Sequence, residues 1–168
     1  MKPTIAITAG DINGVGYEVL IKSLANSHVT EICRPIVYGN AKVARQHLHT
    51  LDEEYRNIQW NIIKDTKQAK EGRLNLISCY SDDTPLQLGT STPEAGQAAF
   101  KSLQRACQDL KKGSVDALVT APINKDNIQS NDFRFAGHTE YLTEQFGEGQ
   151  DSLMMMMSDR MRVALVCN

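Results

Sequence analysis

The sequence has 168 residues, of which 41% are hydrophobic and 23% are charged. This length fits one ordinary domain with a buried core, and the composition excludes disordered and fibrous chains. A net charge of −2 and a pI near 6.1 give no reason to expect nucleic acid or an anionic membrane as a partner. No run reaches the ~20 apolar residues that span a bilayer. The N-terminal segment MKPTIAITAGD has the pattern of a strand rather than of a secretion signal, so we expect a soluble, cytoplasmic protein.

The cysteines and histidines do not form a recognisable metal-binding pattern. The four cysteines are widely spaced and none belongs to a C-x-x-C pair: Cys33, Cys79, Cys107 and Cys167. This spacing favours free thiols in a reducing cytosol over a zinc site or disulfides. His28, His47 and His49 lie in polar helix-end or helix-surface contexts, and the last two point in different directions on one helix. The sequence predicts no complete metal site within these residues.

The first half of the chain alternates between strand and helix patterns. The apolar run Thr4–Thr8 predicts a strand buried on both faces, and an apolar stripe predicts a helix over 17–26. The next expected elements are a strand at 34–40, a helix at 41–51 and two strands at 58–63 and 74–80.

The second half begins with a loop over 81–93 that is rich in turn formers. It continues with the strongest helical pattern at 93–114, a buried-type strand at 115–122, a short helix from Asn124 and another at 138–147. The methionine run 152–157 is expected to form a hairpin with 161–167, and both are expected to be buried. A strand of this kind must be covered by something that follows it.

The alternation indicates an α/β fold, a sandwich with a largely parallel sheet that is joined at its end by an antiparallel hairpin. Residues 1–168 are expected to form a single α/β unit.

The stretch TAGDINGVG places Gly10, Gly14 and Gly16 between the first strand and the first helix. Such a junction can aim backbone N–H groups at a phosphate, or it can be a tight turn that needs glycine. The spacing is not G-x-G-x-x-G, and Asn40 stands where a Rossmann fold has an acidic residue. No Lys-Ser/Thr follows the last glycine, so the stretch TAGDINGVG is not a P-loop either.

Two further motifs can carry chemistry. ALVTAPINK ends a strand at the edge of the sheet where ligands bind, and its Lys125 is either a phosphate ligand, an acid/base or a surface lysine. AGHTEYL places His138 and Thr139 at a helix start behind Gly137. The pair can present an imidazole, a hydroxyl and free N–H groups to an anionic substrate, or it can simply cap the helix.

TAGDINGVGYE, ALVTAPINK, AGHTEYL and MMMMSDRMRVALVCN occur in this order from Ile5 to Asn168. Together they resemble the N-terminal half of the 4-hydroxythreonine-4-phosphate dehydrogenase family of pyridoxal 5′-phosphate biosynthesis. The resemblance implies the two-domain α/β/α fold of isocitrate and isopropylmalate dehydrogenases, in a homodimer. It also implies oxidation of a phosphorylated hydroxy amino acid with NAD or NADP, followed by decarboxylation to 3-amino-2-oxopropyl phosphate.

On this resemblance, His138 and Thr139 match the pair that contacts substrate, while no catalytic or cofactor-binding residue is assigned. Asp11, Asn13, Gly14 and Lys125 fall near the cleft without a fixed role. The resemblance also implies a divalent metal (zinc, magnesium or cobalt) whose histidine ligands are expected beyond residue 168, in a C-terminal half that is absent here. The family's usual Asp-Pro-(Ala or Ser)-Gly reads Asp11-Ile12-Asn13-Gly14, and we expect the loss of proline to relax this loop.

Three functions therefore stay open. The first is the hydroxythreonine-phosphate dehydrogenase, incomplete as this fragment. The second is a dehydrogenase of the same fold that acts on a phosphorylated sugar acid, erythronate or threonate 4-phosphate. The third is a non-catalytic module that keeps only a phosphate-binding site.

Overall fold

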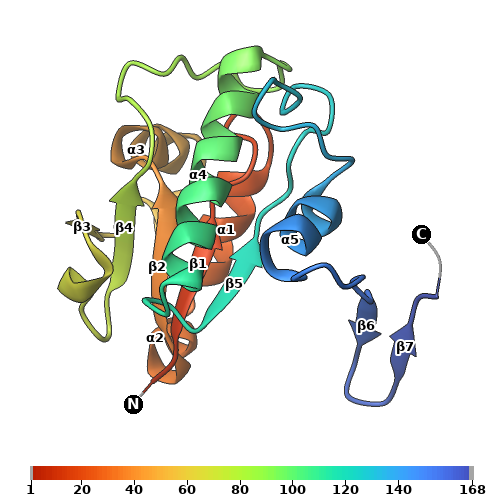
Figure 1. Ribbon diagram of the computed structural model, residues 1–168. Helices are drawn as coiled ribbons and strands as arrows, with labels where there is room; N and C mark the ends of the chain where they lie inside the picture. The colour runs from red at the N-terminus through yellow and green to blue at the C-terminus, as the bar shows by residue number, and fades with distance from the viewer. Residues whose placement is uncertain (1, 167–168) are drawn as a thin grey trace. The chain divides into compact units, whose positions relative to one another are not determined.

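The computed structural model describes residues 2–166. The chain divides into two compact units, Met1–Phe133 and Arg134–Asn168. The first contains a central sheet with helices on it, and the second contains a short helix and a hairpin (Figure 1).

The elements of the first unit follow the expected alternation closely. Its strands are β1 (Thr4–Thr8), β2 (Arg34–Gly39), β3 (Trp60–Ile63), β4 (Leu74–Ser78) and β5 (Ala117–Thr120). Its helices are α1 (Gly16–Leu24), α2 (Ser27–Ile32), α3 (Ala41–Thr50) and α4 (Pro93–Lys111), with 3-10 turns η1 (Glu53–Tyr55) and η2 (Thr66–Gln68). The short helix α2 was not expected; Asn26 begins it by accepting a hydrogen bond from the His28 N–H.

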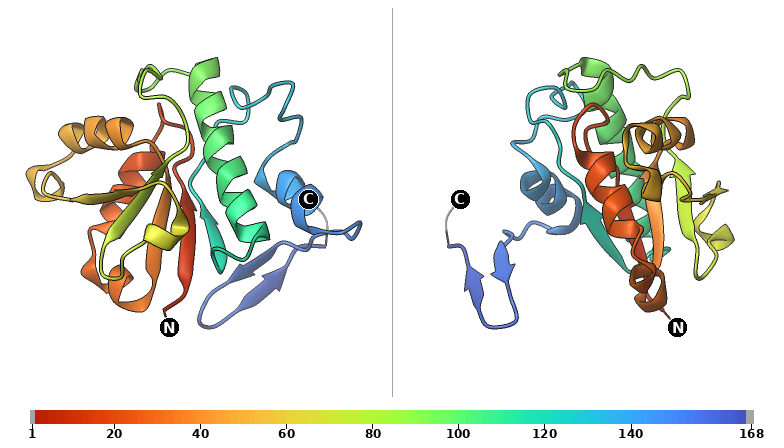
Figure 2. Two further views of the ribbon diagram at one scale, coloured as in Figure 1. Left: turned by 60° about the vertical axis from the view of Figure 1, so that its left-hand side comes forward. Right: turned by 180° about the vertical axis from the view of Figure 1, so that it is seen from behind.

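The five strands form one sheet in the order β3-β4-β2-β1-β5, and every neighbouring pair is parallel. Figure 1 shows α4 in front of this sheet, and the view from behind in Figure 2 shows α1 and α3 on the opposite face. The expected α/β/α sandwich is therefore confirmed.

Alternate residues of the central strands enter two cores. Val37 of β2 and Leu76 of β4 pack in a cluster with buried residues of α1 and α3. Ile36 and Tyr38, the neighbours of Val37, pack instead in a second cluster with Ala106 of α4. Because the sheet is covered on both faces, its strands are continuous apolar runs rather than alternating ones.

The order of the strands fixes where a ligand can bind. From β1 the chain moves to β2 on one side, and after β4 it crosses through α4 to β5 on the other side of β1. The carboxyl ends of β1 and β5 thus form a topological switch point, the place where open parallel sheets usually bind ligands.

The strand β5 differs from its prediction as a buried strand. It pairs only with β1, at the edge of the sheet, and Val119 keeps 51% of its surface exposed. An edge strand has one neighbour instead of two, so the same apolar sequence is less covered.

The second unit contains α5 (His138–Phe146) and the antiparallel pair β6 (Met155–Met157) and β7 (Arg162–Ala164). Tyr141 of α5 is buried, and its ring meets the ring of Phe135 edge-on with centroids 5.3 Å apart. The expected hairpin across the Ser-Asp-Arg turn is confirmed.

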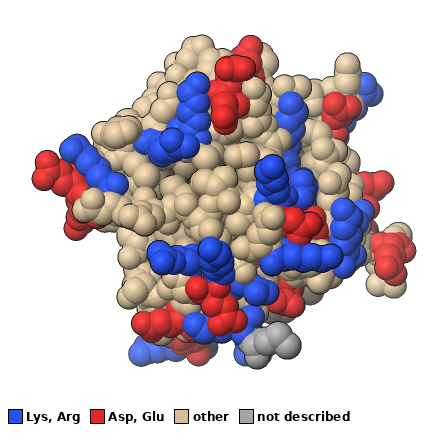
Figure 3. Space-filling model, turned by 90° about the vertical axis from the view of Figure 1, so that its left-hand side faces the viewer, with Lys and Arg blue, Asp and Glu red and all other residues tan. Residues whose placement is uncertain are grey.

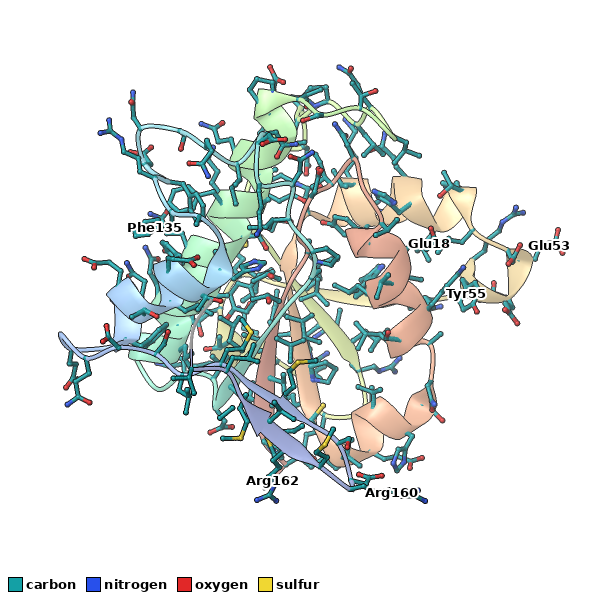
Figure 4. The ribbon with its side chains drawn as sticks, turned by 90° about the vertical axis from the view of Figure 1, so that its right-hand side faces the viewer. Glu18, Glu53, Tyr55, Phe135, Arg160 and Arg162 are labelled. Atoms are coloured by element: carbon teal, nitrogen blue, oxygen red, sulfur yellow. The ribbon has the colours of Figure 1, made fainter. Side chains whose placement is uncertain are left out.

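The expected burial of this hairpin is wrong. It forms a separate two-stranded sheet, and all six of its strand residues are exposed. Met156 and Met157 keep 62% and 64% of their surface, and Arg160 and Arg162 lie at the turn of the hairpin (Figure 4). A two-stranded ribbon cannot bury both of its own faces. Cys167, which belonged to the predicted strand, lies outside the described residues.

The surface does not gather charge of one sign on the face shown in Figure 3, where basic and acidic side chains alternate around an uncharged middle. Over residues 2–166, no helix has the length and apolar content to cross a membrane.

Candidate functional site

The first loop, residues 9–15, joins β1 to α1 at the switch point. Gly10 has φ of +67°, and a Cβ at this position would overlap the carbonyl oxygen of Pro122. The N–H of Asp11 donates to that same oxygen at 2.9 Å. Glycine is therefore needed here for both its conformation and its size, and it ties the end of β1 to the segment that follows β5.

Of the two interpretations of the first loop, the structure supports the tight turn. The Asn13 N–H donates to Asp11 Oδ1 at 3.0 Å, and the Gly14 N–H donates to the Asp11 carbonyl at 3.2 Å. These donors face inward to Asp11, in the manner of an Asx turn, rather than outward to a phosphate.

The first loop is packed and hydrogen-bonded even though Ile12 stands where the family pattern has proline. Ile12 is fully buried, and Asn13 is 3% exposed. The Asn13 side chain donates to the Thr90 carbonyl and to Thr92 Oγ1, and it accepts from the Gln87 N–H at 2.8 Å. These three side-chain hydrogen bonds join the first loop to the segment before α4.

A buried histidine supports the same loop from α3. His47 Nε2 lies 2.8 Å from the Ile12 carbonyl, and the imidazole stacks on the Tyr17 ring with centroids 4.9 Å apart. The expected surface position of His47 is thus wrong, because its side of α3 faces the core and not solvent. Burial lowers its pKa, so the ring is neutral and donates to the carbonyl. His28 and His49 are exposed as expected.

The segment after β5 forms a single turn instead of the expected helix. Asn124 Oδ1 accepts from the N–H groups of Asp126 and Asn127, and the Asn124 carbonyl accepts from the Ile128 N–H. This local capping closes one turn without continuing into a helix. Lys125 is exposed on this turn and makes no ion pair among the described residues.

Asp11 and Asn127 meet at the switch point. Asp11 is 9% exposed, and its Oδ2 accepts a long 3.5 Å hydrogen bond from Asn127 Nδ2. The other side-chain atom of this amide, Asn127 Oδ1, is buried without a hydrogen-bond partner. Asn127 was not singled out from the sequence, because nothing in the pattern NKDNIQ marks one asparagine over the other.

His138 and Thr139 are the first two residues of α5 in the second unit. No side chain caps this helix, so the capping interpretation of the pair is not what the structure shows. His138 Nε2 is buried without a hydrogen-bond partner, and burial lowers the pKa of the ring. The Thr139 hydroxyl makes no hydrogen bond to any described residue, while the Thr139 carbonyl accepts from Thr143 Oγ1 at 2.8 Å. Both side chains keep hydrogen-bonding capacity.

The described residues do not fit the divalent metal that the resemblance implies. Among positions 2–166, no three His, Cys, Asp or Glu side chains lie close enough together to hold a metal ion. The three described cysteines, Cys33, Cys79 and Cys107, are free thiols.

The first loop and β2 do not form a Rossmann nucleotide site either. Asn40, at the position of the missing acidic residue, caps α3 by accepting from the Lys42 and Val43 N–H groups. Its Nδ2 donates to the Tyr80 carbonyl and to Asp82. Since every group of this side chain is engaged within the protein, it is not available to a ribose.

Comparison with known proteins agrees with the fold and the motifs. Residues 31–168 match the family described as pyridoxal phosphate biosynthetic protein PdxA. A 4-hydroxythreonine-4-phosphate dehydrogenase from Bacteroides thetaiotaomicron is 44% identical over 98% of this chain, which covers 44% of that protein. A putative D-threonate 4-phosphate dehydrogenase from Clostridium botulinum is 36% identical over 96% of this chain and 48% of its own length.

Among solved structures, a 4-hydroxythreonine-4-phosphate dehydrogenase from Burkholderia phymatum superposes with a TM-score of 0.83 at 34% identity. The match covers 98% of this chain and 49% of that protein. The chain thus spans about half the length of the proteins it matches. It belongs to the PdxA family.

Proposed function

We propose that this chain is the N-terminal half of a 4-hydroxythreonine-4-phosphate dehydrogenase that uses NAD or NADP. The reaction would oxidise the hydroxyl of 4-phosphooxy-threonine and release carbon dioxide to give 3-amino-2-oxopropyl phosphate. The observation that carries the proposal is the 44% identity to the Bacteroides protein of that name over 98% of this chain.

The chemistry at the start of α5 supports a role for His138 and Thr139 in binding this substrate. A neutral imidazole donates from one nitrogen and accepts at the other, and a threonine hydroxyl does both. The first N–H groups of a helix are also short of partners and favour anions. Such a set is complementary to a hydroxyl next to a phosphate or carboxylate. In this proposal both residues bind and orient the substrate, and neither is assigned a chemical step.

The divalent metal of the proposed reaction would polarise the hydroxyl and then the ketone. Residues 2–166 hold no set of ligands for it. We further propose that the enzyme is a cytoplasmic homodimer, in keeping with the family resemblance.

A second candidate is a dehydrogenase of D-threonate 4-phosphate. It is favoured by relatives of that putative name at 36% and 33% identity. The two substrates share a phosphate and a hydroxyl, and they differ in an amino group. A phosphate-binding module without catalysis is less well supported, because the first loop uses its Asn13 and Gly14 amides internally.

The experiment is a chimera in which this chain replaces the matching 44% of the Bacteroides protein. NADH or NADPH formation is measured with added divalent metal on 4-phosphooxy-threonine, D-threonate 4-phosphate and D-erythronate 4-phosphate. Preference for 4-phosphooxy-threonine supports the proposal. Preference for a sugar-acid phosphate would favour the second candidate, and a folded chimera without turnover of any of them would contradict both.

A further inference from the structure

The first unit contains two buried carboxylates with different surroundings. Asp109 is 4% exposed, and its Oδ2 is bonded to Arg105 Nε at 3.2 Å and to the Tyr38 hydroxyl at 2.9 Å. Asp11 is 9% exposed, but it has no cationic side chain within ion-pair distance among the described residues. A buried carboxylate without a cation is costly unless other donors satisfy it.

The donors that Asp11 has do not fully satisfy it. Oδ1 accepts from the Asn13 N–H at 3.0 Å, whereas Oδ2 has only the long 3.5 Å contact with Asn127 Nδ2. That distance is beyond the usual range for N–H···O bonds, so Oδ2 keeps most of its capacity to accept.

Beside it lies a second acceptor that lacks a donor. Asn127 Oδ1 is buried and has no hydrogen-bond partner, and leaving a buried amide oxygen unsatisfied is costly. The backbone of Asn127 is fixed close to α4, since a Cβ on Gly96 would overlap the Asn127 carbonyl. The backbones that carry the two acceptors are therefore held in place, since the Asp11 N–H also donates to the Pro122 carbonyl.

The position and the chemistry select one kind of ligand. The pair lies at the switch point between β1 and β5, where parallel sheets bind ligands. One carboxylate and one amide oxygen are complementary to a group with a positive charge and several N–H donors, which is an ammonium group.

We propose that Asp11 and Asn127 form a subsite for the ammonium group of the substrate, and that Asp11 selects an aminated hydroxy acid over a sugar acid. The proposal deepens the proposed function and rests on it for the identity of the substrate. The subsite itself can be tested without that identity.

The first experiment uses methylammonium chloride as the probe and this chain as the protein. The Asn127 side-chain amide signal is followed by ¹H–¹⁵N NMR in wild type, Asp11→Asn and Asp126→Asn, with sodium chloride as the salt control. Asp126→Asn removes an equal charge from the same edge, at an exposed side chain without a hydrogen bond among the described residues. We expect a saturable shift in wild type and Asp126→Asn, with affinity about 10- to 100-fold weaker in Asp11→Asn.

An absent shift in wild type, or an equal shift in Asp11→Asn, would overturn the subsite. Binding that appears only in Lys125→Met would mean that the chain's own lysine occupies the pair, and it would also overturn the proposal. Thermal unfolding of each variant identifies a loss that is due to misfolding. Should Asp11→Asn fail to fold, Asn127→Ala replaces it with the same expectation, and binding is then followed at the backbone N–H of Asn13, which donates to Asp11 Oδ1.

The second experiment places Asp11→Asn in the chimera and compares KM for 4-phosphooxy-threonine and D-threonate 4-phosphate. We expect KM to rise about 10- to 100-fold for the aminated substrate and to change less than about threefold for the sugar acid. An equal rise for both substrates would show a merely structural role and overturn the selection. If methylammonium binds but neither phosphate is turned over, the subsite stands and the proposed function fails.

Discussion

Similar apolar strand sequences are buried in one unit of this chain and exposed in the other. In Met1–Phe133 the strand residues Val37 and Leu76 are fully buried, because helices lie on both faces of the sheet. In Arg134–Asn168 the methionines of β6 are exposed on a ribbon of two strands. Burial is thus decided by the number of layers and neighbouring strands, and the apolar character of a strand does not decide it alone. We infer that the first unit carries most of the folding free energy.

The largest expected effect compares one apolar truncation in each unit. Leu76→Ala removes a fully buried side chain from β4 and should lower the free energy of unfolding by ~2–5 kcal/mol. Met156→Ala, at a side chain that is 62% exposed, should change it by less than ~0.5 kcal/mol. Urea unfolding measures both. Equal losses would break the comparison and place the hairpin within the stable core.

The next effect concerns the contact that joins the ends of β1 and β5. Gly10→Ala combines a positive φ with an overlap on the Pro122 carbonyl and should cost ~3 kcal/mol or more. Gly89→Ala also has a positive φ, of +74°, but its Cβ would meet no atom, so it should cost only ~1–2 kcal/mol. Denaturant midpoints of the two variants give the difference. Similar costs would mean that the Gly10–Pro122 contact is not tight in solution.

A pH effect follows from His47. Burial lowers its pKa in the folded chain from the ordinary value of 6.5, so the unfolded state takes up the proton first. Its contribution to stability is complete above pH 6.5 and is lost as the pH falls through the folded pKa. His47→Gln, which keeps an amide N–H for the Ile12 carbonyl, should reduce the fall in melting temperature between pH 7.5 and 5. A variant as acid-sensitive as the wild type would exclude His47 as the cause.

The smallest effect tests the start of α4. Thr92 Oγ1 accepts from the Ala95 N–H as the N-cap and also from Asn13 Nδ2, so Thr92→Ala should cost ~1 kcal/mol. Thr90→Ala is the matched control, because only the carbonyl of Thr90 makes a hydrogen bond to Asn13, and it should cost less than ~0.5 kcal/mol. Thermal melts of both variants provide the test, and a neutral Thr92→Ala would argue against the cap.

The pattern of the sequence predicted the first unit well, since its strands and helices have clear periods and its connections are short. The bounds of β1 came out as expected from the apolar run Thr4–Thr8. The hairpin was also predicted, but its burial was not, because a run of methionines gives no information about which layers will cover it. Val119 was misjudged for the same reason: the place of a strand in the order of the sheet is a tertiary property.

The candidate site was only partly predictable. Glycines and the His138-Thr139 pair stand out as residue types, so they were found. His47 and Asn127 did not stand out as residue types. The burial of His47 and the missing partner of Asn127 Oδ1 depend on contacts with residues far away in the sequence, which the local pattern does not show. Asn13 was noticed as a departure from a family pattern, yet its three side-chain hydrogen bonds reach a segment more than seventy residues away.

The most direct test of the proposed function is the kcat/KM of the chimera on 4-phosphooxy-threonine after His138→Ala and Thr139→Val. Each variant removes hydrogen-bonding capacity at the start of α5, and Glu144→Gln on the same helix serves as the exposed control. We predict losses of about 10- to 100-fold for each of the two variants, chiefly through KM, and no change for the control. Folded variants that both keep the wild-type kcat/KM would contradict the assignment of His138 and Thr139 to the substrate.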